Sequence, residues 1–181
     1  MMDAESYREA LRQRLLSLSK EQLVDMLEDA AKNWIAHDGL WFLGVEERFG
    51  MEAAIELDAR AWEQFTVIEA RRIMKRHGIE PGSGLDGLEK ALGLRLYAFL
   101  NVQECVRVDE RTLIFRMNEC RVQAARKRKG LPDFPCKPVG LVEYSNFARA
   151  IDPRIRTRCL ACPPDPHPDE FWCAWEFTLE K

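Results

Sequence analysis

The chain has 181 residues, of which 46% are hydrophobic and 31% charged, and its formal net charge is −3. This length predicts one domain with a substantial core, and the small net charge excludes a global field that would draw the molecule to nucleic acid or acidic lipid. The first residues lack the basic and apolar runs of a signal peptide, and the most apolar window, ALGLRLYAFL, contains Arg95 and is too short to span a bilayer. We therefore expect a cytoplasmic protein with no membrane partner and with reduced cysteines.

The first hundred residues predict helices. An amphipathic segment over 6–18 precedes Ser19 and Gln22, which fit a capping box, and the helix that follows is expected to run to His37 and to kink or end at Gly39. Further helices are expected over 40–49, 51–77 and 87–100, with glycines after the first two as stop signals.

Beyond residue 100 the pattern alternates as in strands. Strands are expected over 102–108, 112–118, 154–162 and 171–179, with a helix over 139–151 between the two pairs. This order predicts an α+β fold, with N-terminal helices followed by a roughly four-stranded antiparallel sheet built as hairpin, helix, hairpin. We expect a single domain over 1–181, with a helical part (1–100) and a cysteine-containing α+β part (101–181).

The C-terminal stretch RCLACPPDPHPDEFWCAWEF holds three cysteines close together. If its two strands pair about a turn centred on Pro166, Cys159 lies opposite Cys173, at a separation that a metal ion bridges. Cys162 stands directly before two prolines, where a strand ends, so the chain can curl and bring this thiol to the same point. His167, between two prolines, is expected to be a solvated turn residue.

A thiolate-ligated metal centre is one prediction from these cysteines. Four ligands suffice for zinc or for an iron–sulfur cluster, and cysteines beside loops are well placed to supply them. The candidate metal ligands are Cys120, Cys136, Cys159, Cys162 and Cys173. Two alternatives stay open for the same thiols, because cysteine often packs as a small apolar side chain and can also carry redox chemistry. Cys105 is expected in the core.

A pocket is the second prediction, from the helical half. Asn33, His37 and Trp41 repeat at every fourth position and would share one stripe of a helix, where they could line a pocket. The alternative places Trp41 in the core, with the two polar groups capping or bridging.

The longest helix extends this prediction with Asp58 and Trp62, which share a stripe with Glu69. A buried carboxylate there could act as an acid or base, so Glu69 is a weak catalytic candidate beside His37. The simpler interpretation is an ion pair between Glu69 and Arg72, three residues apart.

The basic run over 121–129 could contact phosphates. No nucleic-acid motif and no interleaved aromatic residue accompanies it, so a solvated helix face is expected and nucleic acid is not an expected partner.

The stretches NWIAHDGLWFLGVEERFG, NECRVQAARKRKGLPDFPCK and RCLACPPD…FWCAWEF resemble an uncharacterised bacterial and archaeal family of cytosolic proteins, over most of the chain. The C-terminal piece is more distantly similar to L-2-amino-thiazoline-4-carboxylic acid hydrolases. It is also similar to vinyl-reductase domains, a small-ligand-binding α+β fold related to trafficking-particle subunits.

Both groups end with a cysteine, a Gly-Asp turn and a Cys-x-Phe strand. Cys159 and Cys173 fit the two cysteines, and Trp175 or Phe177 fits the aromatic residue, but PPDPHPD replaces the short turn and Cys162 is additional. The resemblance implies the fold and a ligand or metal site near these cysteines.

Three functions follow as hypotheses. The first is a cytosolic metal- or small-ligand-binding protein with a cysteine-ligated centre. The second is a hydrolase of a small cyclic amide or thiazoline-like compound, in which a thiolate or metal-bound water attacks and His37 or Glu69 moves protons. The third is a metal-free interaction module that uses the basic run. The sequence does not fix the oligomeric state.

Overall fold

The computed structural model describes residues 3–181 and has the α+β architecture expected from the sequence. Within this range the elements in chain order are α1 (Ala4–Leu16), α2 (Lys20–Phe49), α3 (Met51–His77), α4 (Gly84–Leu92), a short 3₁₀ helix η1 (Leu96–Phe99), β1 (Val102–Asp109), β2 (Thr112–Glu119), α5 (Arg121–Arg128), α6 (Lys137–Ile151), β3 (Ile155–Ala161) and β4 (Cys173–Leu179).

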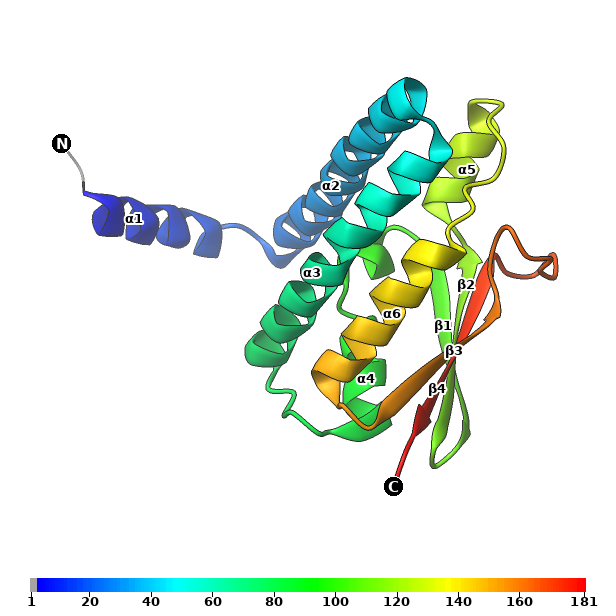
Figure 1. The fold of residues 1–181 in the computed structure, drawn as a ribbon. Helices are drawn as coiled ribbons and strands as arrows, with labels where there is room; N and C mark the ends of the chain where they lie inside the picture. The colour runs from blue at the N-terminus through cyan, green and yellow to red at the C-terminus, as the bar shows by residue number, and fades with distance from the viewer. Residues whose placement is uncertain (1–2) are drawn as a thin grey trace.

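The four strands form one antiparallel sheet in the order β1-β2-β4-β3, so the two hairpins are joined through β2 and β4. Helix α6 connects the hairpins and lies between α3 and the sheet, while α2 packs on α3 from outside (Figure 1). The helical first half and the second half of the chain therefore share one interior, because α6 contacts both α3 and β3.

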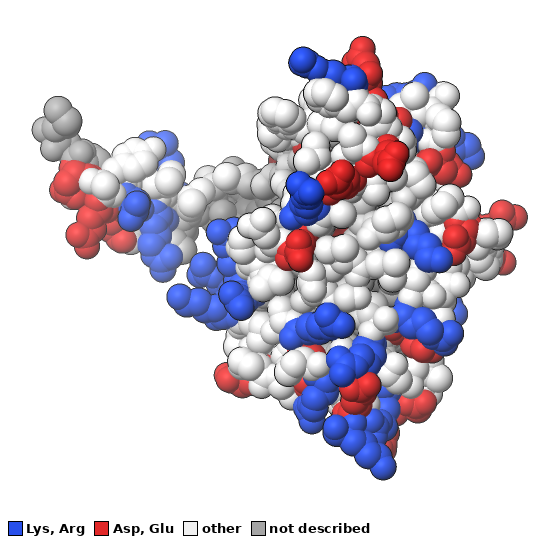
Figure 2. Space-filling view, viewed as in Figure 1, with Lys and Arg blue, Asp and Glu red and all other residues white. Residues whose placement is uncertain are grey.

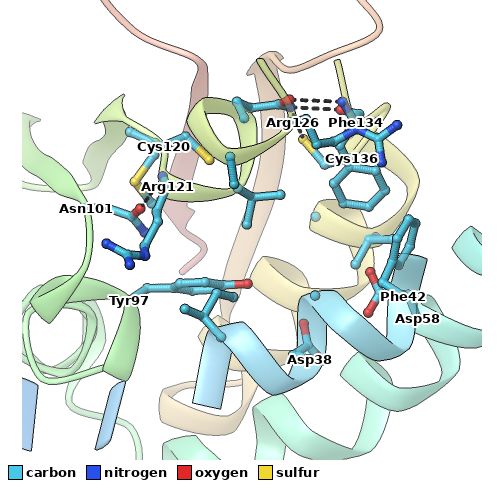
Figure 3. A pocket seen from close by; sticks show the side chains of 18 of the residues that line it. Asp38, Phe42, Asp58, Tyr97, Asn101, Cys120, Arg121, Arg126, Phe134 and Cys136 are labelled. Carbon is cyan, nitrogen blue, oxygen red and sulfur yellow. Dashed lines mark hydrogen bonds between the residues drawn. The ribbon is translucent and has the colours of Figure 1, made fainter. Parts of the chain in front are cut away.

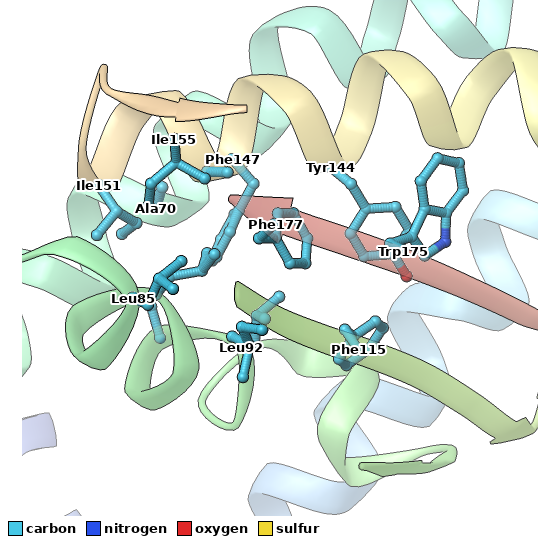
Figure 4. Close-up of a cluster of buried hydrophobic side chains, with 14 of the residues drawn as sticks. Ala70, Leu85, Leu92, Phe115, Tyr144, Phe147, Ile151, Ile155, Trp175 and Phe177 are labelled. Atoms are coloured by element: carbon cyan, nitrogen blue, oxygen red, sulfur yellow. The ribbon is translucent and has the colours of Figure 1, made fainter. Parts of the chain in front are cut away.

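The main core lies between the sheet and the helices α4 and α6 (Figure 4). Alternate residues of β2, including Phe115, are buried, as the period of a half-buried strand requires. Trp175 and Phe177 of β4 are fully buried and face Tyr144 and Phe147 of α6, with the Tyr144 and Trp175 ring centroids 4.8 Å apart. These large side chains dominate the apolar area that stabilises the sheet against the helices.

Local signals account for two of the helix ends expected from the sequence. The predicted capping box at Ser19 and Gln22 is present, and Gly78 ends α3 in the left-handed region at φ 61° and ψ 42°. The expected helix end at Gly39 is wrong, since α2 continues to Phe49. One glycine inside a long helix costs only about 1 kcal/mol, which packing outweighs, and the chain breaks instead at Gly50, where φ is 86°.

The expected helix over 87–100 is shorter and begins earlier. α4 starts at Gly84 and stops at Leu92, and η1 follows after a short turn that contains Arg95. The Arg95 side chain turns into the protein at this break and is only 2% exposed.

The predicted register of the C-terminal hairpin is also wrong. Cys159 lies opposite Trp175 and not Cys173, and an irregularity between Cys159 and Ala161 shifts the pairing. Cys173 pairs instead with Met117 of β2. The long segment between β3 and β4 therefore does not form a symmetric turn about Pro166.

Helix α1 projects away from the body of the protein and buries none of its side chains (Figure 1). Over the face seen in Figure 2, acidic and basic side chains are scattered over a largely neutral surface, and basic side chains are more frequent toward its lower part. None of the helices in residues 3–181 is both long enough and apolar enough to cross a membrane.

Candidate ligand site

A cavity of about 420 Å³ lies between α2, α3 and η1 on one side and α5, α6 and the sheet on the other. Figure 3 shows Asp38 and Asp58 on one wall and Cys120 and Cys136 on the opposite wall. Aromatic side chains, including Phe42, complete much of the lining. Pockets for small organic molecules typically have this volume and this mixture of apolar surface with a few polar groups.

The acidic wall comes from α2 and α3. Burial raises the pKa of Asp38, although His37 opposes the shift. Burial, followed by the charges of Asp38 and Glu143, raises the pKa of Asp58 to about 7, against a smaller opposing hydrogen bond from Trp62. No lysine or arginine within residues 3–181 neutralises either aspartate. The cavity thus contains carboxyl groups that favour a cation or a hydrogen-bond donor.

A buried ion triad lies behind this wall. Arg95 Nε is 2.9 Å from Glu69 Oε2, and Arg95 Nη2 is 2.7 Å from Glu143 Oε1. Burial by itself would lower the pKa of Arg95, but the two glutamates raise it above its ordinary value, so the guanidinium stays charged. Burial raises the pKa of Glu143 despite this contact. One cation is thus shared by two buried acids.

The predicted Glu69–Arg72 pair is therefore wrong, because Arg72 is exposed and Glu69 turns inward to Arg95. Neither Arg95 nor Glu143 was recognised in the sequence as a site residue. A single arginine inside the apolar window ALGLRLYAFL was the available signal, since a charged side chain is almost never fully buried unless it is paired.

An indole N–H marks the floor of the cavity. Trp175 is fully buried and lines the cavity, and its Nε1 has no hydrogen-bond partner in the described part of the chain. Gly140 allows α6 to approach this ring, because a Cβ added at Gly140 would lie 2.5 Å from Trp175 Cζ2. A buried donor without a partner is costly, so a ligand with an acceptor group at this point would satisfy it.

The thiol wall is built by the start of α6 and the segment after β3. Cys136 is the N-cap residue of α6, and its Sγ lies 3.4 Å from Cys162 Sγ. Gln123 of α5 holds the loop before α6 by donating to the Phe134 carbonyl and accepting from the Phe134 N–H, at 2.8 and 2.9 Å (Figure 3). The Gln123 amide also donates to Cys136 Sγ at 3.7 Å.

These contacts and burial lower the pKa of one thiol and raise the pKa of two others. The hydrogen bond with Cys162 lowers the pKa of Cys136, against burial. The hydrogen bonds with Cys136 and Cys173 raise the pKa of Cys162, and burial raises the pKa of Cys120 to about 12. Position at a helix N-terminus also favours the thiolate. Of these three thiols, Cys136 is therefore the one whose surroundings favour the thiolate.

The five cysteines proposed as metal ligands are only partly brought together. Cys120, Cys136, Cys162 and Cys173 all line the cavity, whereas Cys159 does not and packs at the edge of the main core. Across residues 3–181, no group of three or more histidine, cysteine, aspartate or glutamate side chains has an arrangement that could hold a metal ion. The zinc or iron–sulfur centre stays a prediction, and metal quantification on protein purified without oxygen would test it.

Of the pocket residues expected from the helical half, some line the cavity and others do not. Asp58 and Trp62 line the cavity, but Asn33, His37 and Trp41 lie on the exposed face of α2, with Trp41 66% exposed. The alternative that Trp41 packs in the core is wrong as well. The cavity uses the neighbouring face of α2, whose lining residues include Ile35, Asp38 and Phe42. In the sequence, the spacing of Ile35 and Phe42, seven residues apart on either side of Asp38, indicates that face of the helix.

The basic run forms α5, as expected, but Arg126 is not solvated. It is 5% exposed, donates to Glu46 at 2.7 and 3.0 Å and donates to the Pro132 carbonyl at 2.7 Å. This ion pair lowers the pKa of Glu46 and fastens α5 to α2 beside the cavity.

Comparison with known proteins identifies the family. Residues 14–179 match the model of a family of unknown function (DUF6125), and the chain belongs to this family. No curated protein and no solved structure gives a significant match. The similarity to thiazoline hydrolases and vinyl-reductase domains therefore stays a prediction.

Proposed function

We propose that this member of the family binds a small organic molecule with an apolar body and a basic nitrogen in the cavity between α2–α3 and α5–α6. The observation that carries the proposal is the pair of partly buried carboxyl groups, Asp38 and Asp58, that face this cavity without a lysine or arginine partner in residues 3–181. Carboxyl groups taken from water without a counter-charge destabilise a fold, so a cationic ligand beside Asp38 and Asp58 would compensate them. The basic residues of the lining, such as Arg121, come from α5 and its C-terminal end, on the opposite side of the cavity.

The rest of the lining suits such a molecule. Trp62 and Phe42 provide flat apolar contacts, and the indole N–H of Trp175 provides a donor on the far side. A volume of about 420 Å³ is within the range of small-molecule pockets. Apolar burial would then supply affinity, and the few polar groups would fix the orientation of the ligand.

Protonation of Asp58 gives the proposal a pH signature. Its pKa of about 7 means that a cationic ligand binds best once the carboxyl has lost its proton. Linkage then predicts that affinity for an amine rises about tenfold from pH 6 to pH 8 and levels off above that.

Three probes that share one apolar body test the proposal. 4-Phenylbutylamine, 4-phenylbutanol and 4-phenylbutyrate would be titrated into ¹⁵N-labelled protein, following the indole N–H resonance of Trp175. We expect the amine to bind most tightly and to show the pH dependence above. The variant Asp58→Asn should weaken the amine and spare the alcohol, while Glu63→Gln, an exposed change on the same helix, should leave both unchanged.

The proposal fails if the carboxylate probe binds as tightly as the amine, because the acidic wall would then not select the ligand. It also fails if amine affinity is the same at pH 6 and pH 8.

A further inference from the structure

We propose that Cys136 and Cys162 form a redox-active dithiol in the cavity wall, in which Cys136 reacts with a peroxide and Cys162 then closes an intramolecular disulfide. This activity goes beyond ligand binding and does not depend on it. Two observations carry it: the 3.4 Å separation of the two sulfurs, and the backbone hydrogen bond and ion pair that hold their segments side by side.

The two segments are joined directly after the sulfurs, through Lys137. The residue after Cys136 is Lys137, whose N–H donates to the carbonyl of Pro163, the residue after Cys162, at 2.9 Å. The Lys137 ammonium also lies 2.5 Å from Asp165. A disulfide bond is about 2.05 Å long, so closure requires the sulfurs to approach by about 1.4 Å, within the reach of side-chain rotation.

Exposure assigns the order of the two thiols. Both cysteines line the cavity, but Cys136 is partly exposed, whereas Cys162 is only 1% exposed. A peroxide that enters the cavity therefore meets Cys136 first. The Gln123 amide donates to the Cys136 sulfur, Cys162 lies within hydrogen-bond distance of it, and the start of α6 adds the positive end of a helix dipole, so these surroundings favour the thiolate form of the attacking sulfur.

The reaction balances with the peroxide as oxidant. The Cys136 thiolate attacks one peroxide oxygen, the O–O bond breaks, and hydroxide leaves as Cys136 becomes a sulfenic acid. The sulfur of Cys162 then attacks the sulfur of Cys136, the S–O bond breaks, and hydroxide leaves, taking up the proton of Cys162. The two thiols lose two electrons and two protons, and hydrogen peroxide becomes two molecules of water.

Cys173 is the competing partner, because it also hydrogen-bonds with Cys162. It is held in β4 opposite Met117, and no backbone contact like that of Lys137 and Pro163 joins it to Cys162 in the described residues. The geometry therefore favours the bond between Cys136 and Cys162 over one between Cys162 and Cys173.

The experiment uses the reduced full-length protein, stripped of metal by a chelator. One equivalent of hydrogen peroxide is added, free thiols are blocked with iodoacetamide, and the products are read by intact mass and by non-reducing peptide mapping. Of the six cysteines, we expect four to be alkylated after oxidation, against six before, with peptides linked through Cys136 and Cys162. Dithiothreitol should restore all six sites.

Variants separate the two roles. Cys162→Ser should accumulate a dimedone-reactive sulfenic acid at Cys136 and form no disulfide, Cys136→Ser should form neither, and Cys105→Ser, on β1, should behave as the parent protein. The proposal is overturned if all six thiols stay free after peroxide, if Cys136 proceeds to the sulfinic acid while Cys162 stays reduced, or if the disulfide joins Cys173 to Cys162. Cleavage after Phe171 or Trp172 separates Cys162 from Cys173 and so distinguishes the two disulfides. The parent protein alone decides these outcomes, so a variant that fails to fold does not affect the conclusion.

Discussion

Replacing Asp58 by asparagine should stabilise the protein, in contrast to most changes at a partly buried polar residue. Asparagine has the shape of the protonated carboxyl group but never carries a charge. The pKa of Asp58 is raised from its ordinary 3.8 to about 7, so the folded state holds the proton more tightly than the unfolded state. The aspartate therefore has no cost below about pH 3.8, destabilises the fold increasingly as pH rises toward 7, and reaches a constant cost above that.

The magnitude follows from the same two values. Moving a pKa from 3.8 to about 7 corresponds to an upper bound of about 4 kcal/mol at pH 8. Asp58 is only partly buried, so solvent screening reduces this, and we expect a gain of about 2 kcal/mol in the free energy of unfolding. At pH 5, part of the way up the same curve, the gain should fall below about 1 kcal/mol.

Urea denaturation followed by tryptophan fluorescence at pH 8 and pH 5 measures this difference. Glu63→Gln is the matched control, because Glu63 is exposed on the same helix and its change should alter stability by less than about 0.5 kcal/mol at either pH. Equal stability of Asp58→Asn and the parent protein at pH 8 would refute the reasoning, since it would mean that the ionised carboxyl group is already compensated.

Two further substitutions test how the cavity is supported. In Gly140→Ala the new methyl group would lie 2.5 Å from the Trp175 ring, so we expect a loss of about 1–3 kcal/mol in urea denaturation. Gly44→Ala, with open space around its Cβ, should gain up to about 1 kcal/mol, and equal effects of the two changes would contradict the close packing. Arg95→Ala leaves two buried glutamates without their cation and should lose about 3–5 kcal/mol. The exposed Arg72→Ala should lose less than about 0.5 kcal/mol, and a similarly small loss for Arg95→Ala would mean that the triad is not a unit.

The parts of the fold that depend on local chemistry were predictable from the sequence. The capping box at Ser19, the glycine stop at Gly78 and the alternation in the strands each act over a few residues, and the structure has all three. Features decided by tertiary packing were not predictable. Gly39 suggested a helix end, but the contacts of α2 with α3 outweigh the small cost of one glycine.

The site required tertiary information for the same reason. His37 and Asp38 are neighbours in sequence but point about 100° apart around a helix. The sequence pattern indicated the face of α2 that carries His37, which is exposed, whereas the cavity is lined by the face that carries Asp38. The convergence of Cys136 and Cys162 depends on the irregular path of the chain after β3 and on the contact between Lys137 and Pro163. No spacing rule within either segment contains that information.

The stability and the amine affinity of Asp58→Asn, measured together, show whether the Asp58 carboxylate binds the ligand. The acids Glu69, Glu143, Asp38 and Asp58 outnumber the one buried arginine among them, and such an arrangement destabilises the folded state. Unfavourable electrostatics of this kind are typical of functional sites. If Asp58→Asn gains stability and loses affinity for the amine, the acidic wall is therefore a binding surface. If Asp58→Asn gains stability and keeps its affinity for the amine, the cation binds elsewhere in the cavity, because the Asp58 carboxylate would then destabilise the fold without contributing to binding.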